Sequence, residues 1–347
     1  MSRIAIIGAG AWGTGLAIVL GRQGTHQVRL WAHEKEVRDS IAEQHINQLF
    51  LPEYPVPASV TCTNDLQQAV DTADIVVGVM PSHHCRKLFE SAATNLKPGM
   101  LFVSATKGLE NDTLLRMTDV VTQVVTTSCG FRPRIGALSG PSFAKEVARG
   151  DPTAITIASS DAELAQIVQR EFSDPCFRVY TNDDVIGVEL GGALKNIVAI
   201  AAGICDGLHL GHNSVAALIT RGLAEITRLV VSCGGRPETM AGLAGLGDLV
   251  LTCTGGLSRN RSVGVELGRG RGLQEIMVNW AALASGVVDK VFLYYAPKIL
   301  AGTGAVPFAS GPGFRAISDA AYVKSFRLHR FGEDFAVEGY LKDPYRE

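Results

Sequence analysis

The chain opens with the stretch Arg3-Ile-Ala-Ile-Ile-Gly8-Ala-Gly10-Ala-Trp-Gly13, which joins a short apolar run to a segment of helical period. Its glycines have the spacing G-x-G-x-x-G, and their place between a predicted strand and a predicted helix is typical of a dinucleotide-binding turn. Gly8 permits the tight turn, Gly10 lets a pyrophosphate approach the backbone, and Gly13 lets the helix pack closely on the strand. The helix N-terminus offers N–H groups to phosphates. We therefore predict a nicotinamide dinucleotide site here.

The choice of coenzyme depends on the end of the second predicted strand, Leu30-Trp-Ala-His33. NAD-specific sites usually place Asp or Glu there to hold the ribose 2′-OH, whereas Glu34 comes one residue late. His33 with Lys35 could accept a 2′-phosphate, and the alternative is a His33 that is merely solvated. The sequence modestly favours NADP and leaves NAD open.

Apolar runs of strand length alternate with segments of helical period over the first half of the chain. We predict strands at 3–8, 28–33, 74–79, 101–104, 135–138, 153–159 and 177–180. We predict helices at 11–23, 35–43, 65–71, 82–95, 114–125 and 161–172. Continuous apolar strands separated by helices indicate a parallel sheet covered on both faces. The predicted fold is therefore α/β, with a Rossmann-type doubly wound parallel sheet.

The pattern changes near residue 185 and again near residue 272. Long segments of helical period follow the first change, at 185–205, 214–231 and 237–244. After the second come a strand-like run at 290–296, a Gly- and Pro-rich stretch at 302–313 and a strand-like end at 331–341. We predict an NAD(P)-binding domain at 1–185, a helical substrate domain at 186–272 and an atypical α+β tail at 273–347.

Composition narrows the classes of partner. The 347 residues carry a formal net charge of -2, which favours neither nucleic acid nor an anionic membrane surface. Seven scattered cysteines without a C-x-x-C pair predict reduced thiols in a cytoplasmic protein, with no metal site. The start of the chain imitates a secretory signal but lacks a small-residue cleavage site. The most apolar segment, 185–208, contains Glu189 and Lys195, so we expect no membrane insertion.

Two polar clusters follow predicted strands, at the edge of a doubly wound sheet where ligands bind. The first is Ser104-Ala-Thr-Lys107-Gly-Leu-Glu110, and the alternative for Lys107 is an exposed loop lysine. The second is Ser139-Gly140-Pro-Ser142-Phe-Ala144-Lys-Glu146, which enters a predicted helix. Backbone N–H groups there could hold a ligand oxygen, although a plain N-cap at Ser142 explains the segment as well.

Two further clusters lie in the predicted helical domain. Gly191-Gly-Ala-Leu-Lys195-Asn196 places a lysine inside an apolar helix, where it must snorkel, pair or lie beside a ligand. A buried lysine has a lowered pKa, which suits proton transfer to or from an alcohol oxygen. The other cluster, Gly245-Leu-Gly-Asp248, precedes Ser258-Arg259-Asn260-Arg261. Arg259 can hold a phosphate with its planar guanidinium, and the alternative is a solvated helix face.

These clusters together resemble one family, the bacterial NAD(P)-dependent glycerol-3-phosphate dehydrogenases, from about residue 3 to about residue 272. The stretches that carry the resemblance occur in family order: GAGAWGT, LPEYPVP, MPSHH, SATKGLE, SGPSFAKE, GVELGGALKNIVAI, DGLHLGHN, ALITRGLAE and GLAGLGDLVLTCTGGLSRNR. The resemblance implies reversible hydride transfer between NAD(P)H and dihydroxyacetone phosphate. The product would be sn-glycerol 3-phosphate for phospholipid synthesis.

The resemblance also implies roles for individual residues. Lys195 would be the catalytic proton donor and acceptor. The residues implied to surround the substrate are Lys107, Gly140, Ser142, Lys195, Asn196, Asp248, Ser258, Arg259 and Asn260. Those implied to touch the coenzyme, besides Gly8, Gly10 and Gly13, are Ala11, Trp12, His33, Lys107, Ala144 and Arg259. The sequence is compatible with a homodimer and does not determine the oligomeric state.

The tail departs from this family, which would continue after about residue 273 with further helices and a Val-x-Glu-Gly segment near the coenzyme. The stretch 283–302 instead resembles the C-terminal end of the reductase part of riboflavin-biosynthesis deaminase/reductases. The earlier strands of that reductase have no counterpart here, so we expect no second activity. The alternative reading of the chain is a catalytically impaired NAD(P)-binding fusion protein, because a truncated helical domain would expose the apolar faces of 185–205 and 214–231.

Overall fold

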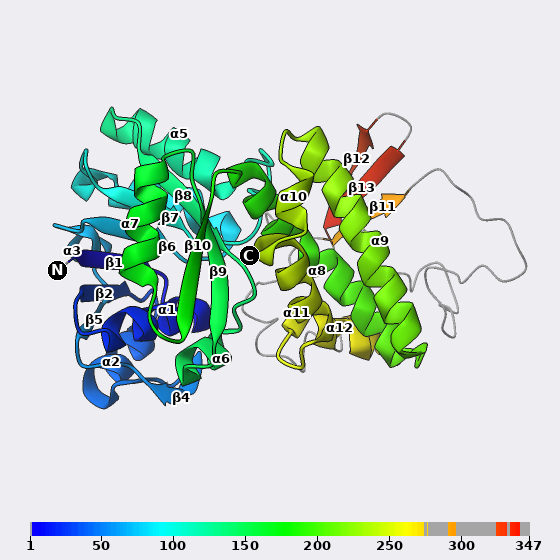
Figure 1. Ribbon diagram of the computed structural model, residues 1–347, viewed down its shortest axis with the longest axis horizontal. Helices are drawn as coiled ribbons and strands as arrows, with labels where there is room; N and C mark the ends of the chain where they lie inside the picture. The colour runs from blue at the N-terminus through cyan, green and yellow to red at the C-terminus, as the bar shows by residue number, and fades with distance from the viewer. Residues whose placement is uncertain (1, 274–275, 277–290, 296–323, 332–333, 341–347) are drawn as a thin grey trace, which may run out of the picture. The chain divides into compact units, whose positions relative to one another are not determined.

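The computed structural model describes residues 2–273, 276, 291–295, 324–331 and 334–340 (Figure 1). The chain divides into two compact units, Met1–Val265 and Glu266–Glu347.

An eight-stranded sheet forms the centre of the first unit, with the strand order β10-β9-β8-β7-β6-β1-β2-β5. The strands are β1 (Arg3–Ile7), β2 (Gln27–Trp31), β5 (Val60–Thr63), β6 (Ile75–Gly78), β7 (Leu101–Ser104), β8 (Arg134–Ser139), β9 (Thr153–Ala158) and β10 (Phe177–Asn182). The sequence predicted all of them except β5, a short edge strand whose residues are half polar. It also missed the small antiparallel pair of β3 (Ile46–Asn47) and β4 (Leu51–Pro55).

The sheet is parallel at every pairing except one, so the predicted doubly wound α/β fold is confirmed with a single correction. β8 and β9 pair antiparallel, with Leu138 opposite Ile157. The connection between them contains only the short helix α6 (Ala144–Arg149). A Cβ on Gly15 of helix α1 would lie 3.3 Å from the carbonyl oxygen of Ala144, so α6 begins close to α1. The chain therefore starts β9 at the same end of the sheet at which β8 finishes.

Helices cover both faces of the sheet because successive strand residues point in opposite directions. Ile4 and Ile6 of β1 belong to one buried core, and Ala5 and Ile7 belong to the other. The first core is closed by α1 (Ala11–Arg22), α2 (Lys35–Gln44) and α7 (Ala162–Phe172). The second is closed by α3 (Leu66–Val70), α4 (Cys85–Ala92) and α5 (Met117–Cys129).

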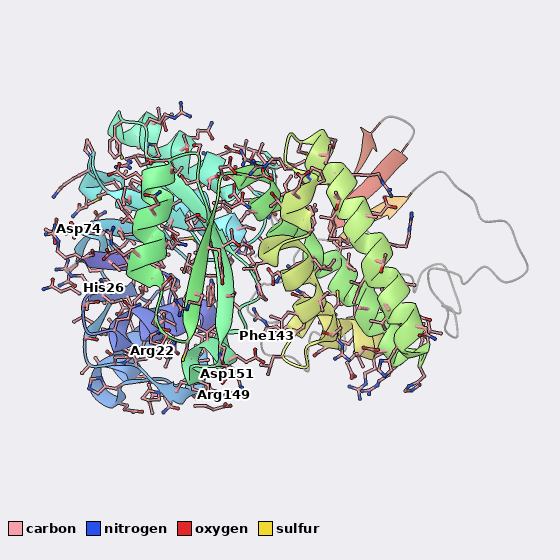
Figure 2. All side chains as sticks on the ribbon, in the orientation of Figure 1. Arg22, His26, Asp74, Phe143, Arg149 and Asp151 are labelled. Atoms are coloured by element: carbon pink, nitrogen blue, oxygen red, sulfur yellow. The ribbon has the colours of Figure 1, made fainter. Side chains whose placement is uncertain are left out.

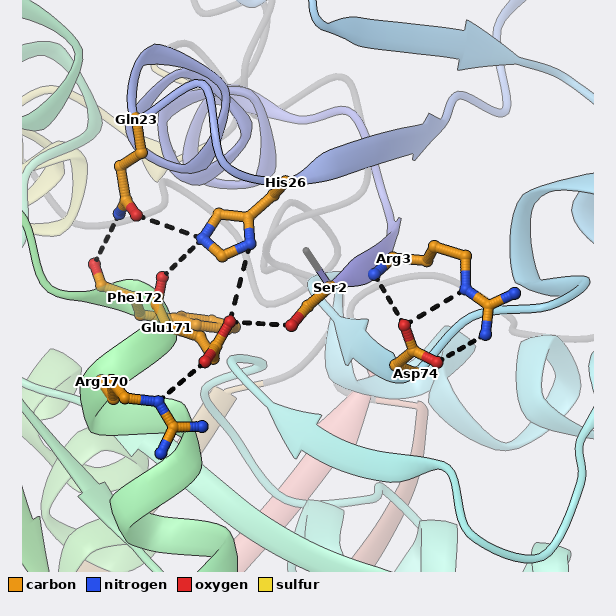
Figure 3. Close-up of polar contacts among 8 residues, drawn as sticks. All are labelled: Ser2, Arg3, Gln23, His26, Asp74, Arg170, Glu171 and Phe172. Atoms are coloured by element: carbon orange, nitrogen blue, oxygen red, sulfur yellow. Dashed lines mark hydrogen bonds and ion pairs between the residues drawn. The ribbon is translucent and has the colours of Figure 1, made fainter.

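Polar contacts fix the amino edge of the sheet, opposite the ends of the strands where ligands would bind (Figure 3). The backbone N–H and the guanidinium of Arg3 donate to Asp74, at 2.8 and 2.7 Å. The Nε2 atom of His26 lies 3.0 Å from the carbonyl oxygen of Glu171, which joins the end of α1 to α7. Figure 2 labels His26 and Asp74 among all the side chains of the unit.

A helical bundle follows the sheet within the first unit, which includes the last helix of the bundle only as far as Val265. Its elements are α8 (Val185–Gly207), α9 (Gly211–Ser232), α10 (Pro237–Met240), a π-helical turn η3 (Leu243–Gly247), α11 (Asp248–Thr254) and α12 (Arg259–Gly268). By length and composition α8 could cross a membrane, yet 56% of its most apolar window is buried inside the protein. Its residues Val198, Ala199 and Ala202 pack in one core with Ile219 of α9 and Leu249 of α11. The helical period predicted from residue 185 onward is therefore confirmed.

Helices α8 and α12 cross in backbone contact at two glycines. A Cβ on Gly203 would lie 2.0 Å from the carbonyl oxygen of Arg261, and a Cβ on Gly264 would lie 2.0 Å from that of Ile200. The Arg261 guanidinium also pairs with Asp206 across the crossing, at 2.6 Å. These contacts fix the start of α12 against α8.

The second unit contains an antiparallel sheet of three strands in the order β11-β13-β12. They are β11 (Val291–Tyr295), β12 (Lys324–Phe331) and β13 (Asp334–Tyr340). The strand predictions at 290–296 and 331–341 are confirmed by β11 and β13, whereas β12 was missed. The predicted loop at 302–313 lies outside the described residues, as does most of the 283–302 stretch.

The glycine crossing can be tested by Gly203→Ala. We expect this substitution to lower the free energy of unfolding by about 3 kcal/mol, because overpacking against backbone outweighs the better helix propensity of alanine. Urea unfolding measures the change. Gly256→Ala is the matched control, since nothing lies within 4 Å of its Cβ position. Equal effects of the two substitutions would contradict a backbone contact at Gly203.

Candidate active site

The glycine turn has the geometry that the sequence predicted. Gly8 follows β1 with φ +123°, and a Cβ there would lie 2.0 Å from the carbonyl oxygen of Val79. A Cβ on Gly13 would lie 1.9 Å from the carbonyl oxygen of Gly8, so α1 packs directly on the turn. Nothing lies within 4 Å of the Cβ position of Gly10, which leaves its outer side open. Two glycines therefore shape the turn, and the third exposes it.

The groups around this turn fit a dinucleotide. Gly10 is the N-cap of α1 and provides no side-chain cap, which leaves the N–H groups of the first turn to a ligand. The indole Nε1 of Trp12 is buried and has no hydrogen-bond partner among the described residues. Ala11 and Trp12 open α1, and Ala144 opens α6 beside it. His33 is exposed past the end of β2, its ring 5.9 Å from that of Trp31.

The centre of the candidate site is one carboxylate shared by two lysines. Asp248, the first residue of α11, is 1% exposed. Its Oδ1 atom accepts a short hydrogen bond from Nζ of Lys195, and its Oδ2 atom lies 2.6 Å from Nζ of Lys107. Lys107 also donates to the carbonyl oxygen of Gly140 at 3.0 Å, and the hydroxyl of Ser142 donates to the same carbonyl. Five of the predicted substrate residues thus form one connected network.

Burial dominates the electrostatics of this network. Desolvation, reinforced by the positive charge of Lys107, lowers the pKa of Lys195 from 10.5 to about 7, against the opposing effect of Asp248. A lysine with such a pKa can give up and regain a proton near neutral pH. The shared carboxylate holds its amino group in a fixed direction.

Three of the remaining predicted substrate residues, Ser258, Arg259 and Asn260, lie at the start of α12. Ser258 is buried, and its Oγ atom accepts a hydrogen bond from the backbone N–H of Arg261 at 3.2 Å. The Arg259 side chain is exposed, and no ion pair or hydrogen bond joins it to any residue that the structure describes. Asn260 is half-buried beside it, and Asn196 is half-buried on α8. Among the described residues, no hydrogen bond or ion pair joins Ser258, Arg259 or Asn260 to Lys195, and the backbone contact between α8 and α12 fixes these two helices against each other.

The pKa of the Cys253 thiol responds to cations from both α8 and α12. Burial raises the pKa of its thiol to about 11, while the positive charges of Lys195 and Arg261 act in the opposite direction. Both cations therefore lie within electrostatic reach of one buried sulfur.

Two side chains near the site were not among the predicted site residues. Phe143, labelled in Figure 2, lies against Gly255, whose Cβ position is 2.5 Å from the phenyl ring. This contact joins the loop before α6 to the end of α11. Glu189 is a buried residue of α8, and its carboxylate accepts a hydrogen bond from the backbone N–H of Thr118. The signal for Glu189 was its position in an otherwise apolar helix, whereas nothing in the sequence marked Phe143.

A cavity of about 340 Å³ lies elsewhere on the first unit and contains none of the predicted site residues. It is lined by Thr156, Asn182, Arg236, Glu238, Thr239, Gly242, Leu243 and Ala244. In the part of the chain that the structure describes, no group of three or more His, Cys, Asp or Glu side chains could hold a metal ion.

The fold and the site together define a class of protein: a Rossmann-type oxidoreductase that uses NAD or NADP and carries a buried lysine in a separate helical bundle. Comparison with known proteins narrows the class. Residues 3–165 match the family model for the N-terminus of NAD-dependent glycerol-3-phosphate dehydrogenase. Residues 184–295 match the model for its C-terminus.

Individual relatives agree with the family models. The chain is 68% identical over 289 residues to glycerol-3-phosphate dehydrogenase (NAD(P)+) of Koribacter versatilis (strain Ellin345), covering 83% of this chain and 85% of that one. It is 56% identical over 294 residues to the protein of the same name from Acidobacterium capsulatum, covering 84% and 86%. A crystal structure of glycerol-3-phosphate dehydrogenase from Coxiella burnetii superposes with a TM-score of 0.75 at 42% identity, covering 80% and 83%. The chain therefore belongs to the NAD-dependent glycerol-3-phosphate dehydrogenase family.

The lowered pKa of Lys195 predicts a dependence of stability on pH. Between about pH 7 and pH 10.5 the unfolded chain holds a proton on Lys195 that the folded chain has lost. This group therefore makes the free energy of unfolding rise with pH across that window. We expect the change between pH 7 and pH 9, measured by urea unfolding, to be more positive in the wild type than in Lys195→Met. Identical changes in both proteins would contradict the lowered pKa.

Proposed function

We propose that this chain interconverts dihydroxyacetone phosphate and sn-glycerol 3-phosphate with Lys195 as the proton donor and acceptor. The network of Lys195, Asp248 and Lys107 carries the proposal, because it combines a buried amine of lowered pKa with a second cation. When bound, the reduced nicotinamide supplies the hydride. The coenzyme would be held by the glycine turn together with Ala11, Trp12, His33 and Ala144. Lys107 and Arg259 would lie close to it.

Lys195 would act on the oxygen of the substrate carbonyl. As the carbonyl carbon is reduced, negative charge develops on that oxygen, and an ammonium group beside it both stabilises the charge and donates the proton. Lys107 adds positive potential at the same place. Asp248 would keep both amino groups oriented, and its own charge offsets one of theirs. In the reverse direction neutral Lys195 would accept the alcohol proton.

The start of α12 would hold the phosphate, away from the reacting carbon. Arg259 has no internal partner among the described residues, and a guanidinium binds phosphate oxygens in a bidentate manner. Ser258, Asn260 and the N–H groups of the first helical turn would complete the anion site. Gly140, Ser142 and Asn196 would line the space between phosphate and carbonyl. Binding energy gained at the phosphate then orients the reacting carbon.

Several finer proposals accompany this one. Exposed His33 and nearby Lys35 favour NADP over NAD, since both can meet a 2′-phosphate. All seven cysteines are free, which supports a cytoplasmic location. The protein would form a homodimer. The tail would be a foreign segment derived from a riboflavin-biosynthesis reductase. Because the family match reaches residue 295, we place the join between 272 and 295.

The experiment that tests the function follows NADPH oxidation with dihydroxyacetone phosphate. We expect turnover by the wild type and a loss of about 10² to 10⁴-fold in Lys195→Met, which is the usual contribution of a positioned proton donor. Coenzyme affinity, measured by tryptophan fluorescence, should stay within about twofold because Lys195 serves the substrate. Lys97→Met is the matched control, since Lys97 is exposed and forms a surface ion pair with Asp71. Unchanged turnover in Lys195→Met would remove its assigned role.

A chimeric protein separates the function from the fate of the tail. A family-type C-terminus grafted at residue 272 would supply the further helices that the family resemblance implies there. Activity only in the graft would support the catalytically impaired fusion protein and locate the defect in the tail. Absence of activity in both proteins would overturn the dehydrogenase function for this chain.

The phosphate site is tested by Arg259→Ala. Loss of a bidentate, charge-assisted contact should raise KM for dihydroxyacetone phosphate by about 10- to 100-fold. Reduction of dihydroxyacetone, which has no phosphate, should change little. Arg221→Ala is the control for removing an exposed arginine, since Arg221 pairs with Glu225 on the surface of α9. An equal effect on both substrates would show that Arg259 does not bind the phosphate.

A further inference from the structure

Glu189 makes three contacts that the proposed chemistry does not use. Its Oε1 atom accepts the backbone N–H of Thr118 at 2.9 Å, and its Oε2 atom accepts the Thr118 hydroxyl at 2.5 Å. The guanidinium of Arg116 donates to Oε2 at 3.2 Å. Both Glu189 and Thr118 are buried. A carboxylate inside an apolar helix is thus satisfied entirely by donors from another element.

These contacts cap helix α5 from outside. Arg116 is the N-cap of α5 and provides no side-chain cap of its own, so the first-turn N–H groups need another acceptor. Glu189 supplies it from α8, and its negative charge lies at the positive end of the α5 dipole. Helices α5 and α8 are connected at this point by charge and hydrogen bonds.

The segment that Glu189 holds is the closing end of the loop that carries Lys107. This loop runs from β7 to α5, and a β-bridge between Leu109 and Arg116 closes it two residues after Lys107. The backbone N–H of Glu110 also donates to the carbonyl oxygen of Leu115, at 2.9 Å. A change in the position of Arg116 therefore reaches Lys107 through a short, closed piece of backbone.

We propose that Glu189 is a positioning residue, which fixes the Lys107 loop against the helix that carries Lys195. Asp248 joins the two lysines directly, and Glu189 joins the backbones that bear them. This role rests on the proposed function only for its effect on catalysis, since the structural connection is independent of the substrate.

Charge strengthens the connection. The ionised carboxylate has only acceptors to offer, which matches three donors, whereas a protonated one would bring a donor to the same place. Burial raises the pKa of Glu189 to about 7, with Thr118 and Arg116 opposing the shift and Asp119 adding to it. On the neighbouring helix α4, the buried Cys85 thiol has a raised pKa, to which the charge of Glu189 contributes. The hold on the loop should therefore weaken as the pH falls below 7.

The first test measures hydrogen exchange of the segment 107–118 in the whole protein. Glu189→Gln keeps the shape but presents an amide donor to Arg116 and the Thr118 hydroxyl. We expect exchange in this segment to rise about tenfold, the ratio for loss of roughly one such contact. Asp161→Asn is the matched control, because Asp161 caps α7 and pairs with Arg134 in the same manner. Asp161→Asn should leave the hydrogen exchange of residues 107–118 unchanged.

The pH dependence gives a second readout from the same experiment. After correction for intrinsic exchange rates, protection of 107–118 in the wild type should rise across about one pH unit on each side of 7. Glu189→Gln should show no such rise. Thr118→Val should resemble Glu189→Gln in part, and Thr118→Ser should restore the wild-type protection, because it keeps the hydroxyl.

A double-mutant cycle tests the route to catalysis. We expect Glu189→Gln to lower kcat/KM about tenfold in the wild type and by less than about twofold in the Lys107→Ala background, because a residue that acts through Lys107 has nothing left to position there. Equal effects in both backgrounds, or unchanged exchange at 107–118, would overturn the inference. A wild type without turnover would count against the proposed function, and the exchange measurements would still decide the role of Glu189.

Discussion

The site depends on one buried carboxylate that two lysines share. Asp248 lies at the start of α11, Lys195 comes from the middle of α8 and Lys107 from the loop after β7. Placing a buried ammonium group beside a partly buried one is costly, and a single carboxylate between them offsets part of that cost. When Lys195 is protonated, the arrangement carries a net positive charge around a carboxylate that is 1% exposed. Such a place suits a substrate oxygen on which negative charge develops.

The fold supplies this arrangement through backbone contacts rather than through large side chains. Gly13 lets α1 rest on the turn at Gly8, and Gly203 and Gly264 let α8 and α12 touch. A side chain at any of these positions would displace a helix that bears a site residue. Close packing of backbones therefore fixes the turn at Gly8, and it fixes the helix that carries Lys195 against the helix that begins at Arg259.

Much of the fold and of the candidate site could be predicted from the sequence, and the features that could not be predicted have physical causes. The glycine turn, the central strands and Lys195 are local signals, since each depends on spacing within a few residues. The antiparallel pairing of β8 with β9 could not be predicted in this way, because a short helix does not show on which side the chain returns. Nor could the partners of Glu189: Thr118 and Arg116 are about 70 residues away, and only the folded chain brings them to α8.

Among its contacts with other elements, helix α8 carries three that bear on the site, at Glu189, Lys195 and Gly203. The first and the last lie 14 positions apart, or about 21 Å along a helix that behaves as a stiff rod. A small tilt of this rod would move the Lys107 loop, Lys195 and helix α12 in concert. A displacement of α8 at one of these contacts would therefore be transmitted along the helix to the other two. Adjustment of the site by independent movement of its parts is mechanically disfavoured.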